Sequence, residues 1–372
     1  MHICIVSPRL YFYLDPTSES PAGGSQRQQY LLTRELTRRG IPVSAVVGEY
    51  GQPDYTLYQN VPTIKGVPES IDSSRQIPRA FYSLFTAMKK SGADIFYVRG
   101  APRLFVATSL IAQLLQKSVV FSVANDRDLD REYLSKRYHP LFQQSYFWSL
   151  RFADGIVTQT ETQKKILKHR FGFDSVHIPN GYDLPTRDEL IPHSERDSVL
   201  WVGTSDPDQK KPLRFVDVAR KLPSISFDMV SKPKTDDPQH HQTVKEKAKS
   251  TPNLRFHGAV GPQDVHEFYR RATMLVNTSK YEGFPNTFLE AWRYQTPVIS
   301  EHFSLPELPH KMTKYLNLDP DDELSHIIKT LHTDPNKREE VGYISRRYMD
   351  DNYNINSVMR QYVQLFRNID RS

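Results

Sequence analysis

Residues 175–203 have the sequence SVHIPNGYDLPTRDELIPHSERDSVLWVG, and this stretch divides the chain. It begins with a short apolar run that ends in Pro179-Asn180-Gly181, as is typical of a strand followed by a turn. A polar segment, Tyr182–Asp197, separates this run from a second apolar run, Ser198–Gly203. A polar, proline-bearing segment between two strand signals is typical of a boundary between domains.

Short apolar runs rich in β-branched residues alternate with helix-period segments on both sides of this boundary. The expected strands are 3–7, 43–47, 94–98, 119–123, 155–158 and 175–178 in the first half, and 199–202, 226–230, 254–257, 274–277 and 297–299 in the second. Strands that alternate with helices form parallel sheets with helices on both faces. The pattern therefore predicts an α/β protein with two Rossmann-like domains.

We expect an N-terminal domain of residues 1–185 and a C-terminal domain of residues 186–352. Residues 353–372 should form a helix, because their apolar side chains recur at helical spacing. We expect this helix to cross back to the N-terminal domain.

The 372 residues are 38% hydrophobic and 25% charged, which excludes a fibrous or largely disordered chain. No apolar run reaches the roughly 18 residues of a membrane-spanning helix. The first residues, Met1–Val6, predict a buried strand and not a signal peptide. A single cysteine, Cys4, excludes an internal disulfide and a cysteine-rich zinc site. We therefore expect a cytoplasmic protein.

The net charge of +6 is confined to the first half. Residues 1–185 contain 22 Lys and Arg against 16 Asp and Glu, whereas the remainder contains 27 of each. This bias favours an anionic partner, such as a membrane surface, a phosphate-bearing substrate or nucleic acid. The alternative is a solvated and slightly basic surface.

A glycine pair, Gly23-Gly24, follows the first expected strand and leads into a helix. Ser25 and Gln28 fit a capping box at its start. Free backbone N–H groups at such a site can bind an anion, and glycine lets a phosphate approach closely. The segment is not G-x-G-x-x-G, which disfavours a dinucleotide-binding oxidoreductase. The alternative is a flexible loop before a helix.

The segment Tyr281–Glu290 follows another expected strand. Pro285 suits the first turn of a helix, so Glu282 should lie on the preceding loop and Glu290 on the helix. The amides of the first turn could bind a diphosphate. Glu290 could accept hydrogen bonds from two vicinal ribose hydroxyls, and Glu282 could hold sugar hydroxyls. The alternative for Glu290 is a surface glutamate on an amphipathic helix.

This segment resembles the E-x7-E motif of glycosyltransferase family 4, whose members have the two-domain GT-B fold with an interdomain cleft. The resemblance covers nearly the whole chain in the expected order. It includes the Gly23-Gly24 loop, the hinge motif Pro179-Asn180-Gly181, the donor-domain start Val199–Gly203 followed by Lys210-Lys211-Pro212, and Phe256–Val260 beside the base pocket.

The resemblance implies a retaining transfer of a sugar from a nucleotide diphosphate to an acceptor hydroxyl, without a metal or other cofactor. It places Glu282 at the donor sugar as a catalytic residue, Glu290 at the ribose and Lys210 at the diphosphate. The remaining implied donor contacts are Gly23, Gly24, Gly203, Val260, Gly283, Phe284, Pro285, Asn286 and Thr287. A lysine fixed beside the departing diphosphate would stabilise the charge that develops there.

One position departs from the family pattern. Many relatives have an arginine directly after the glycine of the donor-domain strand, whereas this chain has Thr204. Either Lys211 or another basic residue replaces it, or donor affinity is low. An inactive relative is a further alternative, against which Lys210 and the two glutamates argue.

Asp126 follows an expected strand, where active sites of such sheets lie. A His or Asp at this place often faces the donor sugar in family 4, so Asp126 is the second candidate catalytic residue, with Arg99 on the preceding strand as a possible neighbour. The alternative is a helix-capping aspartate. Asp126, Asp128 and Asp130 also imitate a calcium loop, but Arg131 and Arg137 occupy its glycine and glutamate positions.

Basic and aromatic residues alternate over Arg131–Phe152, a combination that suits a membrane interface. The alternative is a helix that packs its aromatic residues into the core. Nucleic acid is disfavoured, since there is no recognisable binding module. The histidines, His240-His241 included, show no spacing that requires a metal.

The sequence thus favours a cytoplasmic hexosyltransferase of surface polysaccharide or glycolipid biosynthesis. Its expected partners are a UDP- or GDP-sugar donor, a glycan or lipid-linked acceptor, and the inner membrane face through the basic N-terminal domain. The alternatives are a sugar-nucleotide epimerase of the same fold and a donor-binding pseudoenzyme or membrane scaffold.

Overall fold

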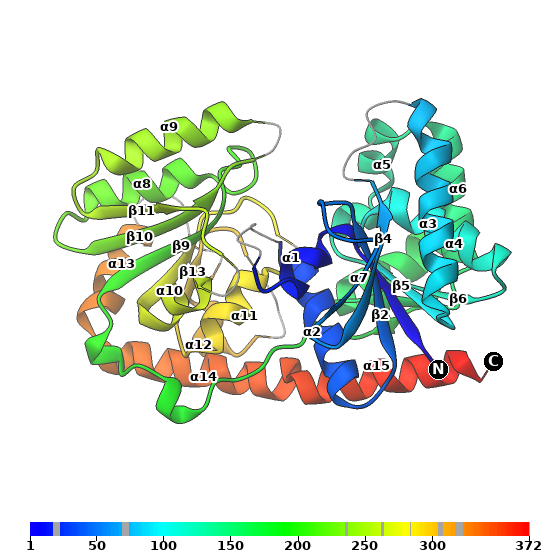
Figure 1. Cartoon of the computed structure of the whole chain (residues 1–372). Coiled ribbons are helices and arrows are strands. Elements are labelled where there is room, and N and C mark those ends of the chain that lie inside the picture. Colours follow the sequence, from blue (N-terminus) through cyan, green and yellow to red (C-terminus); the bar gives the residue numbers. More distant parts are fainter. Residues whose placement is uncertain are drawn as a thin grey trace. The chain divides into compact units, whose positions relative to one another are not determined.

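The computed structural model describes residues 1–17, 23–68, 74–234, 237–261, 264–282, 284–303, 308–316, 318 and 323–371 (Figure 1). The chain divides into two units. The first comprises residues 1–181 and 355–372, and the second comprises residues 182–354. These divisions lie a few residues from the boundaries expected from the sequence.

The first unit contains an eight-stranded sheet with the order β3-β4-β2-β1-β5-β6-β7-β8. All its neighbouring strands are parallel except β3 and β4, which are antiparallel. The strands are β1 (Ile3–Val6), β2 (Val43–Gly48), β3 (Tyr55–Tyr58), β4 (Val61–Val67), β5 (Ile95–Arg99), β6 (Ser118–Ser122), β7 (Gly155–Thr158) and β8 (Val176–His177).

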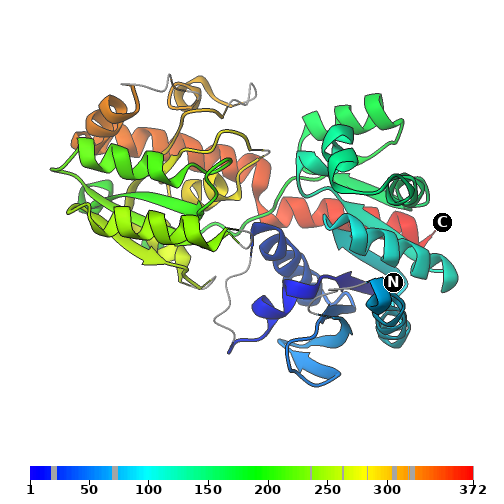
Figure 2. The same cartoon turned by 90° about the horizontal axis from the view of Figure 1, so that it is seen from above.

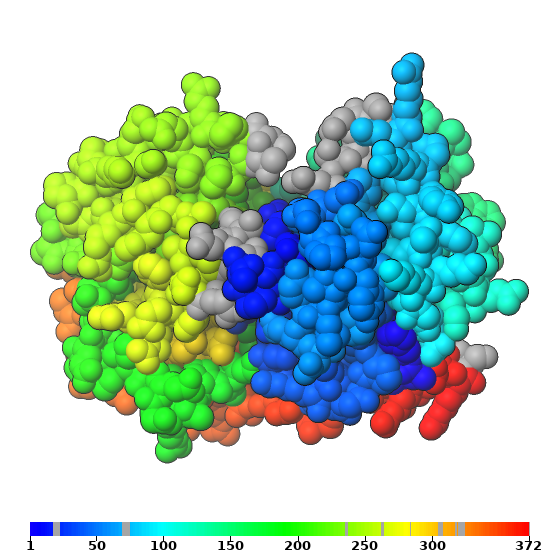
Figure 3. All heavy atoms as spheres, in the orientation of Figure 1, coloured from blue at the N-terminus to red at the C-terminus, as the bar shows by residue number. Residues whose placement is uncertain are grey.

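The β3–β4 hairpin was not expected from the sequence. Its turn places Gln59 and Asn60 at φ of 49° and 64°, as in the tight turns that suit the twist of a hairpin. Pro62 pairs with Leu57 of β3, the edge strand of the sheet. The hairpin lies on the face of the first unit that Figure 3 shows.

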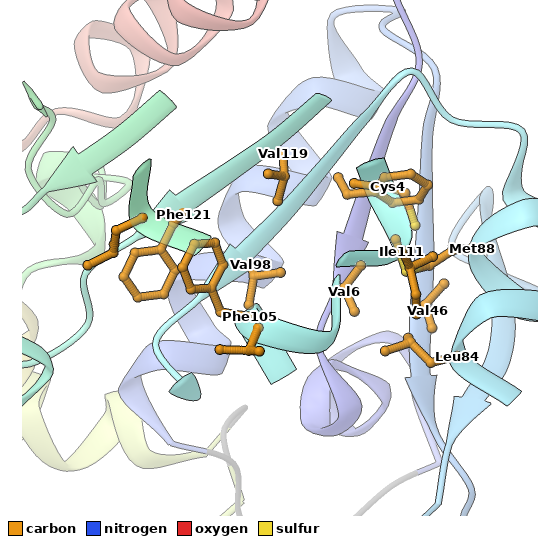
Figure 4. Close-up of a cluster of buried hydrophobic side chains, with 14 of the residues drawn as sticks. Cys4, Val6, Val46, Leu84, Met88, Val98, Phe105, Ile111, Val119 and Phe121 are labelled. Carbon is orange, nitrogen blue, oxygen red and sulfur yellow. The ribbon is translucent and has the colours of Figure 1, made fainter. Parts of the chain in front are cut away.

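Helices pack on the sheet of the first unit around a continuous apolar core (Figure 4). The rings of Phe105 and Phe121 stack at 4.1 Å, and Cys4 is fully buried, which raises the pKa of its thiol to about 11. The α-helices are α1 (Tyr11–Leu14), α2 (Gly24–Arg38), α3 (Ile77–Ser91), α4 (Pro102–Leu114), α5 (Arg131–Arg137), α6 (Pro140–Arg151), α7 (Glu161–Ile166) and α15 (Ile355–Asp370).

The last helix, α15, belongs to the first unit although it ends the chain. Tyr362 lies against Tyr97 of β5, with their hydroxyls 3.3 Å apart. A Cβ at Gly181 would meet the Ile355 side chain at 2.6 Å and the Cβ of Val358 at 3.2 Å, so glycine favours this close approach of the helix. The two chain ends lie side by side (Figures 1 and 2), and the amino group of Met1 is 3.6 Å from the carboxylate of Asp370.

The second unit contains a five-stranded parallel sheet with the order β11-β10-β9-β12-β13. Its strands are β9 (Ser198–Thr204), β10 (Ser226–Lys232), β11 (Leu254–Gly258), β12 (Ala272–Asn277) and β13 (Val298–Ser300). Its helices are α8 (Pro212–Lys221), α9 (Pro238–Lys249), α10 (Val265–Arg271), α11 (Asn286–Trp292), α12 (His310–Thr313), α13 (Glu323–Thr333) and α14 (Pro335–Tyr353). The predicted α/β fold with two Rossmann-like units is confirmed.

Candidate functional site

A short loop after β9 carries the lysine that the sequence assigned to the donor. Asp206 closes this loop, because its carbonyl accepts hydrogen bonds from the amides of Lys210 and Lys211 at 3.0 and 2.9 Å. The Asp206 carboxylate also accepts from the amides of Asp208 and Gln209, and it forms an ion pair with Lys234 at 3.1 Å. Burial opposes ionisation of Asp206, but these bonds keep its pKa below the ordinary value.

Thr278, just after β12, holds the same loop from the other side. Its hydroxyl oxygen lies 2.7 Å from the carbonyl of Lys210 and 3.2 Å from that of Lys211, and it accepts a hydrogen bond from Trp201 Nε1 at 3.0 Å. A Cβ at Gly203 would meet the Trp201 ring at 2.7 Å. Packing against Trp201 therefore explains the glycine at position 203 without a donor contact.

Lys210 Nζ forms an ion pair with Glu282, and both side chains are mostly buried. The structure thus brings together the two residues that the sequence assigned to the diphosphate and to the donor sugar. Glu282 lies beyond the carboxyl end of β12, and Lys210 lies beyond that of β9, its neighbour in the sheet. Ligands of open α/β sheets bind at this edge.

Glu290 lies on α11, which begins at Asn286 with Pro285 as its N-cap residue and not as part of its first turn. Glu290 is only 5% exposed, and its carboxylate is 3.5 Å from the guanidinium of Arg293. The alternative of a surface glutamate is therefore wrong. Glu290 is thus a buried carboxylate on α11 that is paired with a guanidinium on the same helix.

The other expected donor contacts of the second unit have different surroundings. Asn286 accepts a hydrogen bond from the Tyr182 hydroxyl at 3.0 Å. The ring of Phe284 packs among Trp292, Phe303 and Tyr353, so its side chain is part of an aromatic cluster. The remaining expected contacts are half-buried Thr287 and Val260, and Gly283, which lies outside the described residues.

Two side-chain pairings near this edge were missed by the sequence analysis. Ser205 Oγ lies 2.7 Å from both Ser231 Oγ and His241 Nδ1, and burial lowers the pKa of His241. Arg214, in the first turn of α8, binds the buried Glu301 at 2.9 Å. These pairs join residues 26 to 87 positions apart, so no local pattern announces them.

The largely polar sequence that follows β10 contains the regular helix α9, which Asp237 caps by accepting from the amide of His240 at 3.0 Å. Val244 and Ala248 of α9 are buried in the core of the unit. Two apolar side chains four residues apart suffice to dock an otherwise polar helix.

In the first unit, α2 begins at Gly24 with Gly23 as its N-cap. The amide of Gly23 donates to Gln26 Oε1 at 3.1 Å, so the expected capping box of Ser25 and Gln28 is wrong. Gln28 is buried instead and accepts from the amide of Gly181 at 3.1 Å. The helix thus begins at the glycine pair itself.

Asp126 lies in a short 3-10 turn after β6, and its carboxylate accepts from Gln163 Nε2 at 2.8 Å. Asp128 accepts from the amides of Ala124 and Asn125, and desolvation raises its pKa to about 6. Asp130 caps α5. Among the described residues, no group of three or more His, Cys, Asp or Glu side chains could hold a metal ion.

Arg99 is buried at the carboxyl end of β5 and donates to Asn180 Oδ1 at 2.6 Å and to Ser122 Oγ at 3.3 Å. Asn180 in turn donates to Gln159 Oε1 at 3.0 Å. The tripeptide Pro179-Asn180-Gly181 therefore has a structural explanation within the first unit: its asparagine is anchored to the sheet and its glycine packs on α15.

Most of the basic and aromatic segment packs inward. Tyr146 is fully buried, and Tyr138, Phe142 and Phe147 pack against the core. Arg131 lies over the rings of Phe147 and Phe171. For these residues the alternative of core packing is the right one. The exposed apolar side chains of α6, α4 and the residue after α6 are Leu141, Trp148, Phe152, Leu110 and Leu114.

Two family models match the chain. The model of glycosyltransferase family 4 matches residues 22–185, and the model of glycosyl transferases group 1 matches residues 196–334. The chain belongs to the GT-B glycosyltransferases. This glycosyltransferase is 26% identical over 161 residues to the alpha-galactosylglucosyldiacylglycerol synthase of Streptococcus pneumoniae (strain ATCC BAA-255 / R6). That match spans 41% of the chain and 42% of the relative.

Solved structures share the fold of this glycosyltransferase over its full length. Sucrose-phosphate synthase from Thermosynechococcus elongatus superposes with a TM-score of 0.77 at 17% identity, covering 99% of each chain. HepE of Anabaena, solved in complex with UDP-glucose, gives a TM-score of 0.74 at 13% identity and covers 99% of this chain and 100% of its own. At these identities the likeness shows the fold alone.

Proposed function

We propose that this protein is a retaining hexosyltransferase that uses a UDP- or GDP-sugar and acts in surface polysaccharide or glycolipid synthesis. The observation that carries the proposal is the pairing of Lys210 with Glu282 on a rigid loop, with the buried Glu290 on the helix that follows. The curated relative is a glycolipid synthase, and HepE was solved with UDP-glucose, which supports the substrate class.

In this reaction the bond between the anomeric carbon and the diphosphate oxygen breaks, and its electron pair stays on the diphosphate. Lys210 would exchange Glu282 for the diphosphate and stabilise the charge that develops there. Glu282, released from Lys210, would then accept hydrogen bonds from hydroxyls of the transferred sugar. Fixed cations can do this without a metal ion, so we propose that the reaction is metal-independent.

The test is nucleotide release from a panel of UDP-, GDP- and ADP-sugars, each with and without EDTA. We expect the wild-type protein to release the nucleotide of one of these donors. Release should be slow when water is the only acceptor and faster when a sugar acceptor is added. The Glu282→Gln variant should lose this turnover while it still binds the free nucleotide diphosphate, since that ligand lacks the sugar. Turnover that EDTA abolishes would contradict the metal-independent mechanism.

The same panel separates the alternatives. Conversion of the sugar by an epimerase leaves a new sugar or sugar nucleotide with no glycosylated acceptor. A pseudoenzyme binds a nucleotide saturably but turns over none of the donors. The anomeric configuration of the product, read from its NMR coupling constant, decides whether the transfer is retaining.

We also propose that Asp126 and the Gly23-Gly24 helix start contact the donor from the first unit. Asp126 is half-buried, and among the described residues its carboxylate accepts a hydrogen bond from the Gln163 side chain. Asp128 and Asp130 are engaged by backbone amides. Of the three aspartates, Asp126 is thus the one suited to bind a substrate.

We propose a peripheral membrane contact through an exposed apolar patch on α4 and α6, composed of Leu110, Leu114, Leu141, Trp148 and Phe152. These side chains are 48–67% exposed, and Trp148 stacks on Phe152 at 5.6 Å. Exposed cations, Arg103, Lys117 and Arg151, flank the patch in sequence. None of the described helices combines the length and apolar character of a membrane span.

Flotation with phosphatidylglycerol vesicles at low salt tests this contact. We expect the Trp148→Ser/Phe152→Ser variant to float at least tenfold less than the wild type, because burying either ring contributes about 1.5–3 kcal/mol. Tyr343→Ser removes an aromatic ring of similar exposure, 57%, from α14 of the second unit and should float like the wild type. Equal flotation of both variants, or none of the wild type, would contradict the proposal.

A further inference from the structure

Four cations near the proposed donor site are each paired with a carboxylate, so these pairs carry no net positive charge. Lys210 is already paired with Glu282, Arg214 with Glu301, Arg293 with Glu290, and Lys234 with Asp206. A nucleoside diphosphate brings two or more negative charges, and a site whose cations are all matched by carboxylates offers it no net attraction. A cation beside Lys210 that has no carboxylate partner would supply this attraction.

Lys211 lies beside Lys210 and has an unusual backbone. It adopts φ 47° and ψ 55°, the left-handed region, as the residue directly before α8. Side chains other than glycine pay a steric penalty there, so glycine at this position should relieve strain. Within the described part of the chain, the Lys211 ammonium forms no ion pair.

The loop also fixes where Lys211 can act. Its amide donates to Asp206 and its carbonyl lies 3.2 Å from the hydroxyl of Thr278, so its Cα is held from two sides beside that of Lys210. A cation that is held in place before the ligand arrives loses less entropy on binding. The other nearby lysine without a carboxylate partner among the described residues is Lys280, which is exposed and has no strained backbone.

We propose that Lys211 is the second cation of the donor site and binds the diphosphate beside Lys210. This inference rests on the proposed function, since it names which residue recognises the diphosphate of the donor. It also assigns the role left open by Thr204, with the positive charge displaced from the end of β9 to the start of α8.

The test compares the binding of UDP and UMP, and of GDP and GMP, to the full chain by calorimetry. Lys211→Gly should weaken binding of the diphosphate about 10- to 100-fold, the value of one hydrogen bond to a charged group, and the monophosphate much less. Its melting temperature should stay equal or rise, because glycine relieves the strained backbone. Lys211→Arg should keep most of the affinity.

Two controls isolate the charge. Gln116→Gly replaces another exposed residue of left-handed conformation, at φ 54° in the first unit, and should change no nucleotide affinity. Lys280→Ala removes the rival lysine. Equal affinity of Lys211→Gly and wild type, an equal loss for UDP and UMP, or a loss confined to Lys280→Ala would each overturn the inference. A wild type that binds no nucleotide would overturn the proposed function itself.

Discussion

Replacing Lys210 with alanine is expected to lower the turnover of the nucleotide sugar about 100- to 1000-fold, the usual cost of one fixed group that stabilises developing charge. The structure gives the reason. Lys210 is held by Asp206 and Thr278 through its backbone, so its ammonium needs little reorganisation to meet the departing diphosphate. Steady-state release of the nucleotide measures the loss.

The ion pair with Glu282 gives this prediction a second readout. Glu282 competes with a ligand for Lys210, so Glu282→Gln should tighten the binding of UDP or GDP while it lowers turnover. Lys210→Ala should weaken both. Lys249→Ala, an exposed lysine at the end of α9, makes the same charge change and should alter neither. If Lys210→Ala lowered turnover but left nucleotide affinity intact, Lys210 would act only by holding Glu282.

The strands could be predicted because each is a compact apolar run between turn signals. All eleven expected strands are present among the described residues, with their ends displaced by at most two positions. In the β3–β4 hairpin, the side chains of β3 alternate between exposed and half-buried positions at the sheet edge. Its turn, Gln59-Asn60, is a weaker turn signal than Asn-Gly. The hairpin was therefore not predicted. An edge strand forms mainly because it pairs with its neighbouring strand, and a local apolar pattern does not reveal that pairing.

The basic and aromatic segment shows how helical spacing could have been used more strictly. On α6, Phe142 and Tyr146 are four residues apart and face the core, whereas Leu141 and Trp148 are exposed, as is Phe152 directly after the helix. The composition of this segment does not distinguish its core-facing side chains from its exposed ones. The membrane proposal now rests on three exposed residues of that segment, Leu141, Trp148 and Phe152, together with Leu110 and Leu114 of α4.

At the candidate site, the pattern of strand, loop and short helix singled out Glu282 and Glu290, and the family resemblance added Lys210. The sequence could not locate Thr278 or Glu301, which act across the sheet on residues 68 to 87 positions away. Nor could it show that Lys211 is left-handed, since any residue type there is compatible with a polar loop. The backbone conformation of Lys211 becomes visible only in the structure.

The second large expected effect is a loss of stability on replacing Arg196, which lies two residues before β9 and is 5% exposed. Its guanidinium donates to the carbonyls of Ile191, Ala272 and Tyr294 and to the hydroxyl of Thr296, at 2.8–3.3 Å. Burial and the nearby Arg338 lower its pKa to about 10, so it stays charged at neutral pH. It therefore ties the start of β9 to the start of β12 and to the turn after α11, the helix of Glu290.

Arg196→Met should destabilise the second unit by about 3 kcal/mol. The variant leaves two buried carbonyls, a half-buried carbonyl and a buried hydroxyl without this donor, and the loss at a buried group costs about 1–3 kcal/mol. Removing a buried charge returns part of that cost. For a unit of this size the change lowers the melting temperature by about 6–12 °C. Lys at the same position should rescue little, since an ammonium cannot reach acceptors spread around a guanidinium.

Tryptophan fluorescence can follow the second unit separately, because Trp201 and Trp292 are buried there and Trp148 is the remaining tryptophan. In a Trp148→Phe background, urea unfolding should show the Arg196→Met transition at lower denaturant with an unchanged slope. Arg347→Met, on the exposed side of α14, removes an arginine without these bonds and should unfold like its parent. A midpoint for Arg196→Met equal to that of Arg347→Met would mean that the four acceptors find water, and that α11 is positioned by its apolar contacts alone.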